Sequence, residues 1–167
     1  EGGSVSWGGS MSAQAIGLLD AVRGGNYEVL DRGTKETRAE QEEVMRQALN
    51  CDVFLGSANA LSEDGILVNI DGNANRVAAY AYGPKTVLLI VGMNKVVKTE
   101  ADAMSRAKNE AAPINAQRFG IQTPCVKNGT CADCKSPECI CCQILITRFS
   151  KVPKRTKVIL VDENLGF

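Results

Sequence analysis

The stretch CVKNGTCADCKSPECICC, residues 125–142, holds all of the chain's seven cysteines except Cys51. Within it, Cys131 and Cys134 form a CxxC pair, a spacing that lets two thiolates bind one metal ion. Cys125 and Cys141 flank the pair on either side and can supply a third and a fourth ligand. These four residues are the candidate metal ligands, and four thiolates suit either tetrahedral zinc or a [4Fe–4S] cluster.

Other interpretations of the cysteines stay open. The closely spaced C-x2-C-x2-C run of bacterial ferredoxins is missing, which weakens the iron–sulfur interpretation. Disulfides are disfavoured in a cytosolic protein, although an empty exposed site would oxidise readily during purification. Inert thiols are the remaining alternative. We expect Cys139 and Cys142 to be spare, and Cys51, just before a buried strand, to be a core thiol.

The chain contains no histidine. This excludes the commonest general base, the Ser-His and Cys-His nucleophile pairs, and every histidine metal site. Any chemistry must therefore use carboxylates, lysine, cysteine, serine, asparagine, backbone amides or a cofactor.

Apolar runs alternate with helical patterns along the chain, which predicts an α/β fold with a mostly parallel sheet. Strands are expected at 27–30, 51–59, 66–70 and 86–92, and helices at 11–23, from Thr34 to 50, 73–83 and 100–119. The last two strands, 143–149 and 157–163, are joined by a short link. We therefore expect them to form a C-terminal antiparallel pair.

Ligands of open α/β sheets bind outside the carboxyl ends of the strands. The candidate ligand-binding residues at these positions are Gly8, Gly9, Ser10, Asn59, Asp64, Asn69, Asp71, Gly72, Asn75, Arg76 and Lys95. We expect the backbone N–H groups of residues 8–10 to point into the same cleft as Asn69, Asp71 and Arg76. A cation near a helix start opposes the helix dipole, so Arg76 should pair with a carboxylate or bind an anion. The alternative is a turn network with one ion pair and no ligand.

Charge and hydropathy limit the kinds of binding partner that the sequence predicts for this protein. The chain has 19 basic and 19 acidic residues, so nothing favours nucleic acid as a partner. No apolar run is long enough to span a bilayer, and no secretory leader is visible, which together predict a cytoplasmic protein. We expect one domain over residues 1–167, with a cysteine-rich loop at 120–142. The chain opens without methionine inside a Gly/Ser-rich loop, which predicts that its domain is N-terminally incomplete.

Several motifs resemble the lactate-utilisation (LUD) domain family of bacteria. They are GGSMS, SEDGILVNIDGNANRVAA, APINAQR and TPC-(x5)-C-x-x-C-KSP. The resemblance covers essentially the whole chain, although family members usually carry a further helix and strand before GGS. It implies the three-layer, Rossmann-like fold shared by ribose-5-phosphate isomerases, glucosamine-6-phosphate deaminases and CoA transferases. It also implies a role in lactate oxidation beside iron–sulfur redox partner proteins.

Three classes of function follow from these observations. The first is a redox accessory protein that holds a cluster in its cysteine loop and a small anionic metabolite at the strand ends. The second is a sugar-phosphate or acyl-CoA type isomerase or transferase, in which Asp64, Asp71 or Lys95 moves a proton and the cysteines are structural. The third is a non-catalytic module that binds a metabolite. The residues alone do not decide whether the protein is an enzyme.

Overall fold

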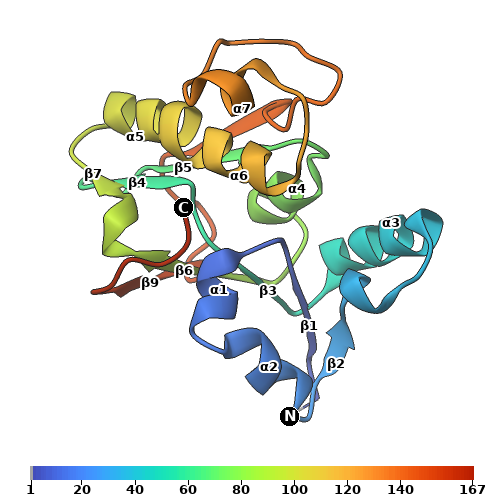
Figure 1. Cartoon of the computed structure of the whole chain (residues 1–167). Helices are drawn as coiled ribbons and strands as arrows, with labels where there is room; N and C mark the ends of the chain where they lie inside the picture. Colours follow the sequence, from blue (N-terminus) through green and yellow to red (C-terminus); the bar gives the residue numbers. More distant parts are fainter. Residues whose placement is uncertain (1) are drawn as a thin grey trace.

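A five-stranded parallel sheet forms the centre of the computed structural model, which describes residues 2–167 (Figure 1). Its strand order is β2-β1-β3-β6-β9, and each neighbouring pair is parallel. The strands are β1 (Ser4–Trp7), β2 (Glu28–Leu30), β3 (Val53–Gly56), β6 (Thr86–Gly92) and β9 (Thr156–Val161). The run TVLLIVG of β6 is almost continuously apolar, as is typical of a parallel strand with both faces covered.

A smaller mixed sheet of order β7-β4-β5-β8 packs beside the first. Its strands are β4 (Ala60–Ser62), β5 (Leu67–Asp71), β7 (Val96–Val97) and β8 (Gln143–Thr147). Strand β5 is antiparallel to both β4 and β8, while β4 is parallel to β7. The expected α/β class with a mostly parallel sheet is therefore confirmed.

The helices pack against the sheets, so the core lies in layers between helices and strands (Figure 1). They are α1 (Met11–Ala15), α2 (Leu18–Arg23), α3 (Arg38–Gln47), α4 (Asn75–Ala81), α5 (Glu100–Arg106), α6 (Ala112–Arg118) and α7 (Pro124–Asn128), with a π-helical turn at Ala107–Ala111. Leu19 and Val22 of α2 share a buried cluster with Leu55 of the parallel sheet. On the opposite face of that sheet, Phe54 packs with Tyr80 of α4.

The outer face of the mixed sheet is covered by small residues. Ala103 of α5, and Ala107 and Ala112 of the segment that follows it, cluster with Val68 and Ile70 of β5. Small side chains let these helical turns approach the strand closely. Within residues 2–167, no helix combines the length and the apolar character needed to cross a membrane.

Two helix boundaries differ from those predicted. The third helix begins after Thr37, not Thr34, because Thr37 and Glu40 form a reciprocal capping box. Thr34 instead ends a short 3-10 turn. The first predicted helix is divided into α1 and α2 at Gly17, whose φ of 71° is in the left-handed region.

The expected pairing of the two last strands with each other is wrong. Strand β8 is antiparallel to its partner, as expected, but that partner is β5. Strand β9 crosses to the other sheet and pairs in parallel with β6, from Val87↔Thr156 to Gly92↔Val161. The link contains a turn in which Arg155 N donates to Val152 O, but this turn leads β9 away from β8, and β6 offers β9 a buried apolar edge.

Candidate functional site

A cleft of about 580 Å³ lies where the loop after β1 meets the carboxyl end of β5. Gly9 and Asp71, which come from different sheets, both line it, as the sequence predicted. The full lining is Gly9, Arg32, Ile70, Asp71, Gly72, Asn73, Asn75, Arg76, Asn115, Arg118, Phe119, Ile121 and Ile140.

Arg76 of α4 spans the floor of this cleft. Its Nη2 donates to Asn59 Oδ1 at 3.3 Å and to the carbonyl of Ile70. Its Nε lies 3.5 Å from Asp71 Oδ2, which gives the predicted ion pair. Gly8 makes room for this side chain, since a Cβ there would lie 2.8 Å from Arg76 Cδ.

Arg32 and Arg118 add two more cations to the cleft, and the sequence did not mark either as a site residue. Among the described residues neither forms an ion pair with a carboxylate. Each instead donates to a methionine sulfur, Arg32 to Met45 at 3.2 Å and Arg118 to Met11 at 3.0 Å. Arg118 also lies over the ring of Phe119. Two signals were available: the motif APINAQR contains both Asn115 and Arg118, and Arg32 lies two residues after β2.

Three predicted site residues do not line the cleft. The N–H of Gly8 donates to Leu55 O at 3.3 Å within the sheet, so it does not point into the cleft as expected. Ser10 caps α1 by accepting from Ala13 N. Asn69 is only 1% exposed and does not line the cleft, and its side chain has no hydrogen-bond partner among the residues described.

Asp64 and Lys95 also lie outside the cleft lining. Asp64 accepts from Ser62 Oγ in the turn between β4 and β5, at the opposite end of β5 from Asp71. Lys95 is only 3% exposed and donates to Ser12 Oγ and Ser57 Oγ.

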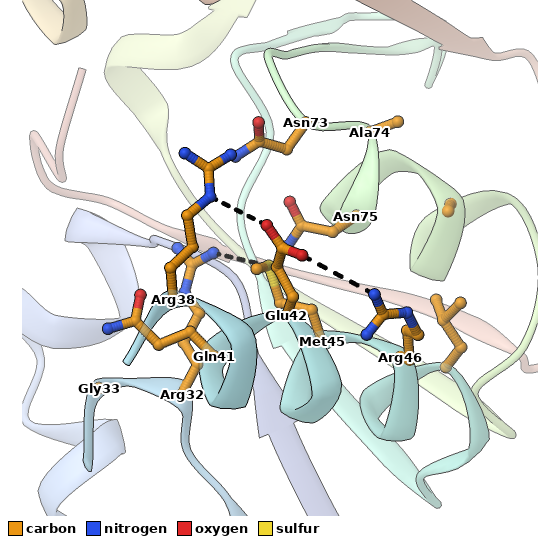
Figure 2. Close-up of a pocket in the computed structure, with 12 residues that line it drawn as sticks. Arg32, Gly33, Arg38, Gln41, Glu42, Met45, Arg46, Asn73, Ala74 and Asn75 are labelled. Atoms are coloured by element: carbon orange, nitrogen blue, oxygen red, sulfur yellow. Dashed lines mark hydrogen bonds and ion pairs between the residues drawn. The ribbon is translucent and has the colours of Figure 1, made fainter. Parts of the chain in front are cut away.

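A second groove, of about 810 Å³, continues from the cleft between α3 and the start of α4 (Figure 2). The two share Arg32, Asn73 and Asn75. Figure 2 shows Glu42 between Arg38 and Arg46, at 2.9 and 3.8 Å respectively. Glu42 thus supplies an acidic partner to two of the three arginines of the groove, whereas Arg32, which lines both the groove and the cleft, has none among the described residues.

Five cysteines surround a separate cavity of about 60 Å³, and these are Cys125, Cys131, Cys134, Cys139 and Cys141. All seven cysteines of the chain are free. Cys139, expected to be spare, is thus part of this thiol cluster and accepts the Cys141 N–H at 3.3 Å. Cys142 is exposed, and Cys51 is a core thiol, as expected.

The thiol cluster provides suitable donors for a soft metal, although its sulfurs are not drawn together. In the described part of the chain, no three Cys, Asp or Glu side chains approach closely enough to hold an ion. Burial, and then the neighbouring Cys139, raise the pKa of Cys141 to about 12. Clustered thiolates repel one another, and a bound cation would offset that repulsion.

Ile140 lines both the cleft and the cavity of the thiol cluster. Its Cα would lie 3.3 Å from a Cβ placed on Gly72. A single residue therefore separates the two candidate sites.

Comparison with known proteins gave two findings. A family model described as the LUD domain matches residues 1–161. A solved structure, a DUF162 family protein from Deinococcus radiodurans, aligns with 95% of this chain and 87% of its own at 16% identity, with a TM-score of 0.42. No curated protein matched the chain.

Proposed function

The chain belongs to the LUD domain family, and from this premise we propose that it binds a small carboxylate metabolite, such as lactate or pyruvate, in the cleft. The observation that carries the proposal is the charge of the cleft. Three arginines line it, and among residues 2–167 only Arg76 is paired with a carboxylate there. Two cations without an acidic partner favour an anionic ligand.

The remaining lining residues suit a small polar ligand. Arg32 and Arg118 would bind its carboxylate through charge-assisted hydrogen bonds. Asn75 and Asn115 present amides that can bond a hydroxyl or keto oxygen. Phe119 and Ile121 provide an apolar wall for a methyl group. In a lactate-utilisation role, the protein would bind this metabolite beside iron–sulfur redox partners.

Replacing Arg118 with Ala is expected to weaken binding of pyruvate or L-lactate by about 10- to 100-fold, the loss of one charged hydrogen-bond pair. Isothermal titration of both variants with each compound measures the change. Arg148→Ala is the matched control, because Arg148 follows β8 at the end remote from Asp71. If neither compound binds the wild type, or if Arg118→Ala binds as tightly, the proposal is wrong.

A second function is favoured by the thiol cluster, which we propose binds a [4Fe–4S] cluster or a zinc ion. Cys125, Cys131, Cys134 and Cys141 are the proposed ligands, and Cys139, which lines the same cavity, is the alternative to one of them. An iron–sulfur cluster would supply one-electron transfer, whereas zinc would only stabilise the loop. Lys108 also lines the cavity, but its ammonium is paired with Asp133 at 2.5 Å, so the bound metal would have to balance most of the thiolate charge.

Anaerobic reconstitution should distinguish the two metals. Protein incubated with iron and sulfide, or with zinc, is expected to bind one of them stoichiometrically, as measured by elemental analysis and absorption spectra. Changing Cys131 and Cys134 to Ser should abolish this binding. Changing exposed Cys142 to Ser should leave it intact, and equal loss in both variants would argue against a defined site.

A further inference from the structure

Lys95 is buried beside two serine hydroxyls at the carboxyl edge of the parallel sheet. Its Nζ lies 2.9 Å from Ser12 Oγ and 3.1 Å from Ser57 Oγ, and the two hydroxyls are 3.2 Å apart. Ser12 lies on α1 after β1, Ser57 follows β3, and Lys95 ends the 3-10 turn after β6. Three neighbouring strands thus bring these residues together from distant parts of the chain.

The charges around Lys95 favour its neutral amine. Among residues 2–167, no carboxylate lies within ion-pair distance of its Nζ, and the charged groups that act on it are Arg106 of α5 and Arg76 of α4. Burial first, and then these two cations, lower its pKa to about 8. A neutral amine in hydrogen-bond contact with a serine hydroxyl is the arrangement of a Ser–Lys nucleophile pair.

The C-terminal segment 163–166 covers this cluster. Ser12 Oγ donates to Leu165 O at 3.0 Å, and a Cβ on Gly166 would lie 2.9 Å from Ser12 Oγ. Asn94 holds the segment through two hydrogen bonds: its Oδ1 accepts from Leu165 N and its Nδ2 donates to Gly166 O. Access to Ser12 therefore requires this segment to move.

We propose that Ser12 is a nucleophile for an activated acyl group, with Lys95 as its general base and Ser57 as the residue that orients the amine. Ser12 is chosen over Ser57 because it contacts the covering segment directly. Its Oγ forms a bond to the acyl carbon of an ester or thioester while the bond to the alkoxide or thiolate leaving group breaks. Lys95 takes the Ser12 proton and passes it to the leaving group, so no net charge or electron is transferred. Water then releases the acid from the acyl-serine.

The test uses p-nitrophenyl acetate as the probe, with mass spectrometry to locate the acetyl group. Wild-type protein should become acetylated on Ser12, at a rate that rises with pH through the pKa of Lys95, about 8. Lys95→Met should slow this step by about 100-fold, the usual contribution of a general base. Asn94→Ala should accelerate it, because the covering segment is released.

Two controls make the outcome decisive. Lys98→Met removes an exposed lysine three residues away and should leave the Ser12 rate unchanged. Circular dichroism of each variant confirms that it is folded. Acetylation confined to surface lysines in both wild type and Asn94→Ala, or a Ser12 rate equal in wild type and Lys95→Met, would overturn the proposal.

Discussion

Replacing Lys95 with Met is expected to stabilise the folded protein at pH 7 by up to about 3 kcal/mol, because burial and two nearby cations lower the pKa of this lysine to about 8 from its ordinary 10.5; the loss of its hydrogen bonds to Ser12 and Ser57 offsets part of this gain. In the unfolded chain the ammonium is fully hydrated, whereas in the folded protein it is 3% exposed and has no carboxylate within ion-pair distance in the described chain. The protonated side chain therefore favours unfolding.

The sign of this effect can be tested through its pH dependence. The cost of burying Lys95 is fully present below its folded pKa of about 8 and disappears as pH rises to the unfolded value of 10.5. In that interval the unfolded state binds more protons, so this residue makes stability increase with pH. Urea unfolding at pH 7 and at pH 10 should show a smaller difference between wild type and Lys95→Met at the higher pH. A difference that does not change with pH would mean that Lys95 is not destabilising in the way described.

Gly56→Ala is expected to destabilise the fold by about 2 to 4 kcal/mol, through overpacking and the loss of buried hydrogen bonds. A Cβ at this position would lie 2.0 Å from Tyr80 Oη and 2.8 Å from its Cζ. The Tyr80 side chain cannot easily move away from the added Cβ, because its hydroxyl donates to Ser57 O at 2.9 Å and accepts from Ser57 N. Thermal and urea unfolding measure the loss.

A double-mutant cycle identifies the cause. Tyr80→Phe removes the clashing hydroxyl, so Gly56→Ala should cost less in the Tyr80→Phe background than in the wild type. Gly9→Ala is the matched control, since its nearest contact would be Arg32 Nη2 at an ordinary 3.7 Å. Equal costs for Gly56→Ala and Gly9→Ala would contradict the steric explanation.

The class of fold could be predicted from local patterns, but several elements could not. The apolar run of β6 is long enough to identify without tertiary information. Strand β1 was missed because its four residues, SVSW, lie in a Gly/Ser-rich stretch typical of loops. The start of α3 was predictable, since Thr37 is followed by Glu40 at capping-box spacing while Thr34 is not followed by an acid at that distance.

The candidate cleft was predicted in part. Gly9 and Arg76 follow strands and Asp71 ends one, so the rule for open α/β sheets could identify them. Arg32 lies two residues after β2, so the same rule could have identified it, whereas Arg118 ends α6, where a single arginine has no distinguishing pattern. Their role depends on which acidic groups the fold places near them, and only the three-dimensional arrangement provides that information. The same is true of Lys95, whose burial is invisible in its local sequence.

The position of β9 has a consequence for biosynthesis. This strand is the last of the parallel sheet in sequence, yet it pairs along the length of β6 and continues into Leu165, a buried residue. The edge of β6 therefore stays open until residues 156–165 have left the ribosome. Pairings between segments so far apart in sequence form slowly. An apolar strand with an unpaired edge is prone to aggregate until its partner strand pairs with it. We expect the nascent chain to complete this sheet only after β9 has emerged, and chaperones that shield apolar strands would act before that point.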